Sequence, residues 1–232
     1  MKKSSILILI IICLVGCKKG SNETTITGEI KGLGTDTLYL YGMDELYDRI
    51  DTIYVENDKF SYTTSVDTIT SAYLLLKNRI EYPVFLDKGN KIKIKGDTIN
   101  LNFLTISGNI YNEEFTDFQK ALEDPADPSE KAGEETVDKR TTVEKANTAE
   151  EMAEEFILQH HSSYVSLYLL DKYFVQKETP DFSKIKKLVE VMTGVLQDKP
   201  YIERLNETIT QAEKSEIGKY APFFSLPNAK GE

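Results

Sequence analysis

Between Thr24 and Gly108 the chain alternates short hydrophobic runs with polar turns, the pattern expected of β-strands. The runs are rich in Ile, Val, Thr, Tyr and Phe, and Gly, Asn or Asp interrupts them. Lys91–Lys95 alternates Lys with Ile, which predicts a strand with one buried and one exposed face. Short strands with frequent turns favour an antiparallel sandwich or barrel. The predicted strands are Thr25–Lys31, Thr37–Tyr41, Ile50–Val55, Phe60–Thr64, Ala72–Lys77, Tyr82–Leu86, Lys91–Lys95 and Phe103–Ser107.

After Asn109 the hydrophobic residues recur every three or four positions, which is the period of an α-helix. On this basis Glu113–Leu122 is predicted to be helical. Thr148 and Glu151 fit a capping box, in which two side chains satisfy the free N–H groups at a helix start. We therefore predict a long helix from there to about Val175.

Two further helices are predicted after Pro180 and Pro200, because proline fits the first turn of a helix, where its missing N–H costs nothing. The chain thus divides into a β module (residues 24–108) and a helical module (residues 109–216). Residues 123–147 are rich in acidic side chains and are predicted to form a solvated loop within the helical module. The expected fold class is α+β.

The N-terminus carries the features of a secretion signal. Met1–Lys3 is positively charged, and Ile6–Val15 is an unbroken run of ten apolar residues. As a helix this run is about 15 Å long, half of the roughly 30 Å hydrocarbon core of a bilayer. It is too short to span a membrane and has the length of a signal-peptide core. The run leads into the sequence Leu14-Val15-Gly16-Cys17.

This sequence resembles the lipobox of bacterial lipoproteins. The resemblance implies that a diacylglyceryl group is attached to the Cys17 thiol and that cleavage between Gly16 and Cys17 makes the cysteine the new N-terminus. Residues 1–16 are then the signal peptide and residues 17–23 a short tether. The protein is expected in the cell envelope, facing the periplasm and held by the lipid bilayer, in the outer membrane rather than the inner. The alternative is an ordinary signal peptide or short anchor with an unmodified cysteine.

Composition and charge exclude several functions. The two cysteines of the chain are Cys13 and Cys17. If cleavage removes the first and acylation consumes the second, the mature chain has no thiol for catalysis, disulfides or metal binding. The formal net charge of −10 argues against a nucleic-acid partner, which requires clustered Lys and Arg. No nucleophile–base pair of a hydrolase is recognisable, and we predict no catalytic residue, metal ligand or cofactor.

The segment Ile217–Glu232 resembles the opening of a TlpA/ResA/AhpC-type thioredoxin-like domain, which begins with Gly-x-x-Ala-Pro-x-Phe-x-Leu followed by a glycine. The matching positions are Gly218, Ala221, Pro222, Phe224, Leu226 and Gly231. Phe223 stands where Asp is commoner in that family. With the lipobox, the β module and the helices, nearly the whole mature chain resembles the domain of unknown function that precedes the redox domain in lipid-anchored thiol:disulfide interchange proteins.

This resemblance implies a membrane-tethered accessory region of a periplasmic thioredoxin-like oxidoreductase. In that family a Cys-x-x-Cys motif performs the chemistry at a helix N-terminus, some tens of residues beyond the Ala-Pro segment. The chain as given ends at Glu232, before such a motif, so we do not expect these residues to exchange disulfides. We expect either a piece of a longer redox protein or an accessory that lacks the redox half.

The alternative function is that of a non-enzymatic lipoprotein whose β module binds a peptide, glycan or protein partner. Tyrosine is suited to such a surface, because it offers a flat apolar body with a polar tip. Strand propensity alone also explains tyrosines on strands. The tyrosines on predicted strands are Tyr39, Tyr41, Tyr54, Tyr62, Tyr73 and Tyr82.

The remaining polar clusters favour structural roles. His160 and His161 are neighbours whose side chains would diverge by about 100° on a helix, so they are not expected to share a metal. Gly32 and Gly34 lack the third glycine of a dinucleotide-binding loop and predict a turn. Four carboxylates near a helix start suit the helix dipole without any cation. These are Glu150, Glu151, Glu154 and Glu155.

Overall fold

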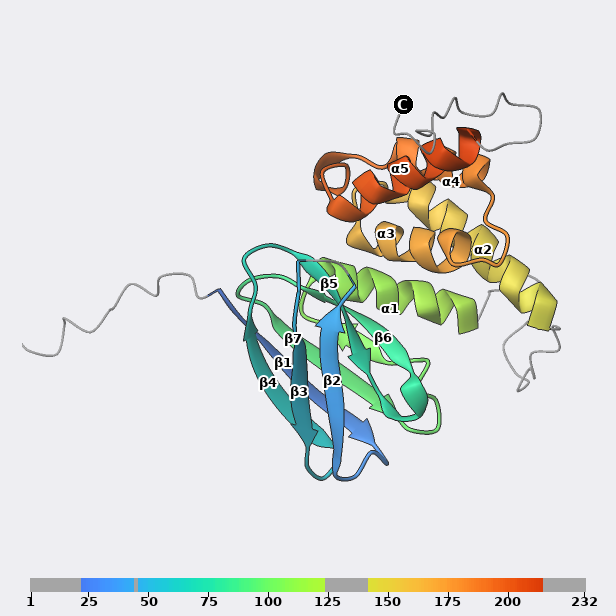
Figure 1. Cartoon of the computed structure of the whole chain (residues 1–232). Helices are drawn as coiled ribbons and strands as arrows, with labels where there is room; N and C mark the ends of the chain where they lie inside the picture. Colours follow the sequence, from blue (N-terminus) through green and yellow to red (C-terminus); the bar gives the residue numbers. More distant parts are fainter. Residues whose placement is uncertain (1–21, 44–45, 124–141, 215–232) are drawn as a thin grey trace, which may run out of the picture.

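The computed structural model describes residues 22–43, 46–123 and 142–214, with the side chains of 142–147 excepted. Within these residues eight strands are followed by five α-helices, and the helices gather at one end of the strands (Figure 1). The lipobox with Cys17, the tether up to residue 21, most of the acidic segment and residues 217–232 lie outside the described residues. None of the described helices is both long enough and apolar enough to cross a bilayer.

The strands form two four-stranded sheets that pack face to face. The strands are β1 (Glu23–Lys31), β2 (Asp36–Gly42), β3 (Ile50–Val55), β4 (Lys59–Ser65), β5 (Thr70–Leu75), β6 (Glu81–Leu86), β7 (Lys91–Asp97) and β8 (Thr105–Ser107). Sheet A has the order β4-β1-β7-β8, and sheet B has the order β3-β2-β5-β6. The predicted α+β class and the sandwich are therefore confirmed, whereas the barrel alternative is wrong because the two sheets do not close.

One strand pairing departs from the antiparallel expectation. β1 and β7 are parallel, with Ile26 opposite Ile92 and Gly28 opposite Ile94, while every other pairing between the described strands is antiparallel. These two strands occupy the centre of sheet A, and the chain between them builds all of sheet B. A parallel pair needs such a long crossover, which the alternation of residues along a strand does not reveal.

The core of the sandwich follows from the alternation of side chains. In β7 the two isoleucines are buried and the three lysines are exposed, as the sequence predicted. Each fully buried Ile or Leu contributes about 1.5–3 kcal/mol relative to exposure. The sandwich side of this core includes Ile26, Ile30, Leu38, Leu40, Leu74, Ile92 and Ile94, all at most 1% exposed.

Helix α1 (Ile110–Glu123) seals the open edge of the sandwich between β6 and β8. The Asn112 side chain accepts a hydrogen bond from the Phe85 N–H (3.0 Å) and donates one to the Phe85 carbonyl (2.9 Å). One turn later, the Thr116 hydroxyl bonds in the same two ways to the N–H and carbonyl of Ile106 (2.9 Å each). An edge strand otherwise leaves these groups unpaired. Because residues four apart share one helix face, a single helix satisfies both edges.

The helices after α1 differ from the single long helix predicted for Thr148 to Val175. They are α2 (Thr142–Gln159), α3 (Tyr164–Leu170), a π-helical turn (Asp171–Val175), α4 (Phe182–Val191) and α5 (Pro200–Lys214). α2 begins six residues before the predicted capping box, so that prediction of a helix start is wrong. Residues 142–147, predicted as the end of the acidic loop, belong to α2.

The predicted helix is also broken at His160–Ser163. Ser163 caps α3 by accepting a hydrogen bond from the Val165 N–H (3.2 Å), and the Ser166 hydroxyl donates to the His160 carbonyl (2.7 Å). Serine side chains that bond to the backbone compete with a continuous helix. All seven residues of α3 are buried, so this helix lies inside the molecule rather than on its surface.

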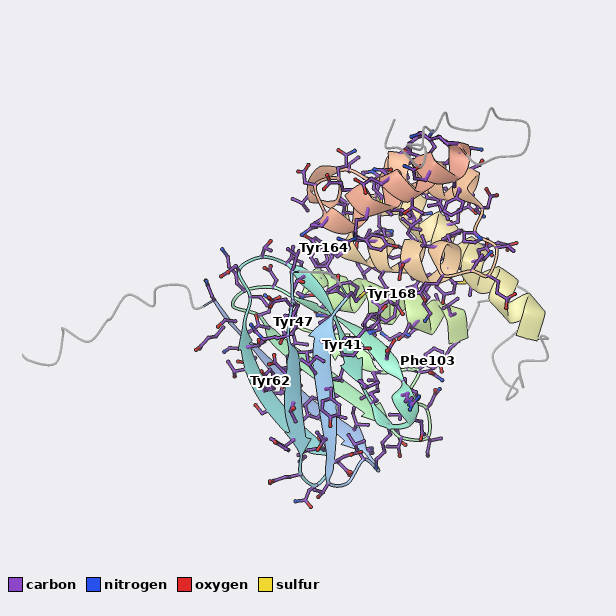
Figure 2. The ribbon with its side chains drawn as sticks, viewed as in Figure 1. Tyr41, Tyr47, Tyr62, Phe103, Tyr164 and Tyr168 are labelled. Carbon is purple, nitrogen blue, oxygen red and sulfur yellow. The ribbon has the colours of Figure 1, made fainter. Side chains whose placement is uncertain are left out.

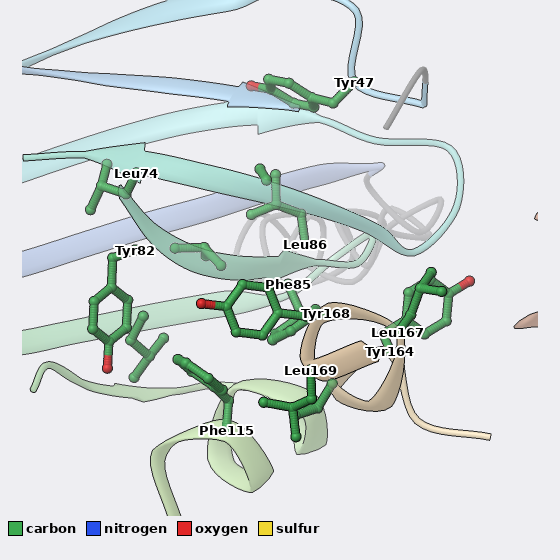
Figure 3. Packing of buried hydrophobic residues seen from close by; sticks show 14 of the residues in the cluster. Tyr47, Leu74, Tyr82, Phe85, Leu86, Phe115, Tyr164, Leu167, Tyr168 and Leu169 are labelled. Carbon is green, nitrogen blue, oxygen red and sulfur yellow. The ribbon is translucent and has the colours of Figure 1, made fainter. Parts of the chain in front are cut away.

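Aromatic side chains join the helices to the sandwich (Figure 3). Phe115 of α1 lies 5.7 Å from Tyr82 and 6.4 Å from Phe85 of β6, measured between ring centroids. On its other side Phe115 lies 5.1 Å from Tyr168 of α3 in an edge-to-face arrangement. The buried apolar residues of both modules consequently form one continuous cluster.

Candidate functional site

The outer face of sheet B carries a row of tyrosines that solvent reaches. The strand register places Tyr41 of β2 opposite Tyr73 of β5, and their ring centroids are 5.7 Å apart. Tyr39 and Tyr54 lie on the same face and are 41% and 73% exposed. Large apolar side chains at such exposure, grouped on one face, are typical of binding surfaces.

The remaining predicted tyrosines do not belong to this row. Tyr82 points into the sandwich, where its hydroxyl donates to the Leu104 carbonyl (2.7 Å) and accepts from the Leu104 N–H (3.1 Å). Tyr62 lies on β4 in sheet A and packs against the core. The sequence pattern predicted that Tyr62 and Tyr82 lie on strands. It did not predict to which sheet each strand belongs.

A cleft of about 420 Å³ opens where the tyrosine row meets the helices. We call this feature the tyrosine cleft. Figure 2 shows Tyr41 on the sheet and Tyr168 at the junction of strands and helices. The volume of the tyrosine cleft lies in the range of small-molecule sites, about 300–1,000 Å³. The residues that define it are Ser71 and Tyr73 of β5, Tyr168 of α3, Asp171 of the π-helical turn, and Tyr201 and Arg204 of α5.

Asp171 is the polar centre of the tyrosine cleft. Its carboxylate accepts hydrogen bonds from the Tyr201 hydroxyl (2.6 Å) and from the Gln176 side-chain amide (2.6 Å), one at each oxygen. Burial and the bond to Asp171 raise the pKa of Tyr201, so its hydroxyl stays protonated and remains a donor at neutral pH. A carboxylate has about four lone-pair positions, so Asp171 retains capacity for further donors.

Tyr73 and Tyr168 also line the tyrosine cleft. Tyr168 is 3% exposed and Tyr73 is half-buried, and neither hydroxyl is among the fully buried polar atoms that lack a partner in the described part of the chain. Burial raises the pKa of both side chains, so both are neutral donors at neutral pH. Each hydroxyl can therefore donate a hydrogen bond to a polar ligand in the cleft.

A second hollow, of about 1,130 Å³, lies along the outward side of α5. Exposed polar side chains such as Glu203, Asn206 and Glu207 line it. Because the lining groups are exposed to solvent and none is aromatic, the tyrosine cleft is the better candidate for a ligand site.

The histidine pair lies at the end of α2, where the two side chains have separate partners. His160 stacks on Phe156 with ring centroids 4.1 Å apart, and the His161 Nδ1 atom lies 3.0 Å from the Thr193 hydroxyl. Among the described residues no three His, Cys, Asp or Glu side chains converge as a metal site would require.

The carboxylates of α2 bind lysines rather than converging on one another. Glu150 pairs with Lys177 (2.5 Å) and Lys184 (3.5 Å), and Glu154 pairs with Lys184 (2.7 Å). Glu151 is exposed on the same helix. These ion pairs tie α2 to α4 and to the segment before it. The predicted helix-dipole role of the cluster is wrong, because α2 begins at Thr142, eight residues before Glu150.

The glycine pair forms the turn between β1 and β2, as predicted. Gly32 and Gly34 have φ values of 79° and 72°, a region that favours glycine. The Gly34 N–H donates a hydrogen bond to the Asp58 carboxylate (2.6 Å), which anchors this turn to the next hairpin.

Fold and cleft together define an α+β protein with a ligand-sized site between a β-sandwich and a helical module. Residues 24–115 match the model of a domain of unknown function (DUF4369). The matched range covers the eight described strands, except Glu23 of β1, and the first turn and a half of α1, with Asn112. No curated protein and no solved structure matches the chain.

Proposed function

We propose that this chain is the membrane-tethered accessory region of a thioredoxin-like thiol:disulfide oxidoreductase lipoprotein in the bacterial cell envelope, and that these residues are not themselves redox-active. The observation that carries the proposal is the combination of a lipobox ending in Cys17 with the thioredoxin-like opening sequence at Ile217–Glu232. The matched domain of unknown function lies between the two.

The expected role of the sandwich and the helical module is to hold a redox domain at the membrane and to present partners to it. β1 begins at Glu23, so five residues separate Cys17 from the first hydrogen-bonded strand. The six residue steps from Cys17 to Glu23 span at most about 22 Å when extended. Two or more acyl chains anchor a protein stably, since each buried methylene contributes about 0.8 kcal/mol.

The variant Cys17→Ser tests the anchor, with Cys13→Ser as its matched control. Metabolic labelling with palmitate should disappear in Cys17→Ser, and the protein should move from the membrane to the soluble fraction. Cys13→Ser should label and fractionate like wild type, because Cys13 belongs to the removed signal peptide. Labelling that survives Cys17→Ser contradicts the proposed attachment.

A second candidate function is supported by the tyrosine row on sheet B and the adjoining cleft. In this function the chain is a non-enzymatic lipoprotein that binds a peptide, glycan or protein partner. The solvent-accessible face of sheet B consists of β-module residues, among them Tyr39, Tyr41 and Tyr54. The tyrosine cleft is lined by residues of the helical module as well. The two functions are compatible, since an accessory region can select what reaches a redox domain.

A further inference from the structure

We propose that the tyrosine cleft is a binding site for a neutral, hydroxyl-rich ligand, a saccharide of one or two rings. This inference rests on the second candidate function and specifies its site and its ligand class. It is carried by the aromatic walls, the mixed hydrogen-bonding groups and the balanced charge of the cleft.

The walls of the cleft suit the apolar faces of sugar rings. Tyr73 lies between two other tyrosines, with ring centroids 5.7 Å from Tyr41 and 6.4 Å from Tyr168. Tyr201 faces them from α5. Tyrosine rings offer flat apolar surface at little conformational cost, and their hydroxyls remain available at the rim.

The polar groups of the cleft suit hydroxyls that both donate and accept. Asp171 has lone pairs beyond those used by Tyr201 and Gln176, so it accepts from a ligand hydroxyl. Tyr73 and Tyr168 line the cleft, and their hydroxyls donate to ligand oxygens. A ligand with many hydroxyls satisfies both kinds of group at once, whereas an apolar ligand leaves them unpaired.

The charge of the cleft favours a neutral ligand. Among its described lining residues the charged side chains are Asp171 and Arg204, whose formal charges cancel. An anionic sugar or a phosphate ligand would meet the Asp171 carboxylate, and the chain as a whole carries a formal charge of −10. A cleft lined by charges of one sign, by contrast, attracts ligands of the opposite charge.

The backbone of the cleft argues against an extended peptide. β5 is hydrogen-bonded on both sides, to β2 and to β6, so it has no free edge on which a peptide could add a strand. The Ser71 carbonyl also accepts from the Met43 N–H (3.0 Å). Recognition here must depend on side chains, and a peptide is therefore the alternative outcome of the test.

The test uses the full chain with Cys17→Ser, which is expected to keep the protein soluble. Isothermal titration measures binding of four neutral disaccharides (maltose, cellobiose, lactose and diacetylchitobiose), of sialyllactose, and of a tyrosine- and lysine-containing tetrapeptide. At least one neutral disaccharide should bind with a Kd of about 1 mM or tighter, and sialyllactose should bind at least about tenfold more weakly than that disaccharide.

Variants then locate the site. Tyr73→Ala and Asp171→Asn should each weaken saccharide binding by about tenfold or more, with Tyr201→Phe as a milder change that removes one hydroxyl. Tyr54→Ala is the matched control, because Tyr54 lies on the same sheet face at its far edge strand and should leave binding unchanged. Thermal melts of each variant show whether it is folded.

Binding of no neutral disaccharide at about 10 mM, or equal loss in Tyr54→Ala and Tyr73→Ala, overturns the saccharide proposal. Tetrapeptide binding that Tyr73→Ala abolishes also overturns it, but supports the second candidate function. The lipid anchor is tested separately by palmitate labelling, so failure here leaves the first proposed function standing.

Discussion

The sandwich and the helical module are stabilised in different ways. In the sandwich, backbone hydrogen bonds join the strands of both sheets. At the open edge, the Asn112 and Thr116 side chains of α1 bond to the strand backbone in place of a neighbouring strand. In the helical module, backbone bonds are local, and the helices depend on aromatic contacts such as Phe115–Tyr168 and on surface ion pairs such as Glu150–Lys177. The tyrosine cleft lies where these two arrangements meet.

The difference teaches that α1 belongs structurally to the sandwich although it is a helix. Its polar face completes the strand edges, and Phe115 connects it to α3. The matched domain agrees, since it extends past the last strand to residue 115. The two modules should therefore unfold together, and the following variants test that expectation.

Phe115→Ala should have the largest effect, destabilising the protein by about 3–5 kcal/mol through the cavity it leaves. Phe115 is 2% exposed and contacts both modules. Hydrogen–deuterium exchange should show faster exchange in the strands and in α3 alike. Ile99→Ala is the control, since Ile99 is 93% exposed. Loss of protection confined to the strands would mean that the modules are independent.

Asn112→Ala should destabilise by about 1–3 kcal/mol, because it leaves the buried Phe85 N–H without an acceptor. The Phe85 carbonyl keeps a bond from Asn109 (2.8 Å), which limits the loss. Urea unfolding measures the effect. Asn100→Ala removes only an exposed bond to Glu123 and should change stability by less than about 0.5 kcal/mol. Equal effects of the two variants would contradict edge sealing by α1.

Glu150→Gln should have the smallest effect, about 1 kcal/mol or less, because Lys177 and Lys184 are partly exposed. Burial raises the pKa of Glu150, but the hydrogen bond from Lys177 and the charges of both lysines outweigh it and leave the pKa below its ordinary value of 4.5. The ion pairs therefore stabilise the folded state above that pH and lose their effect as the pH falls and Glu150 is protonated.

Urea unfolding at neutral pH and at about pH 3 checks this dependence. The difference in the free energy of unfolding between wild type and Glu150→Gln should be smaller at the lower pH. Glu151→Gln, on the exposed side of α2, should have the same free energy of unfolding as wild type at both pH values. A gap that stays constant with pH would show that the ion pairs do not stabilise the fold.

The strands were predictable from the sequence because each depends on its own alternation. β3 has the predicted bounds Ile50–Val55, and the predicted strand Lys91–Lys95 lies within β7. The pairing of β1 with β7 was not predictable, because it depends on contacts between residues about 65 positions apart.

The tyrosine cleft was predictable only in part. The sequence singled out Tyr41 and Tyr73 as possible binding tyrosines, but Tyr168, Asp171 and Tyr201 come from helices that approach sheet B only in the folded chain. Tyr168 lies in an apolar run that reads as an ordinary buried helix. Nothing in its local spacing indicates that it lines a cleft beside sheet B.

The most direct test of the proposed function is the mass of the native protein isolated from membranes, together with tandem mass spectrometry of its peptides. The proposal predicts an N-terminal peptide that begins at Cys17 and carries acyl chains, and a chain that continues from Ile217–Glu232 into a domain with a Cys-x-x-Cys motif. An unmodified cysteine at position 17, with no Cys-x-x-Cys in the protein, would contradict it.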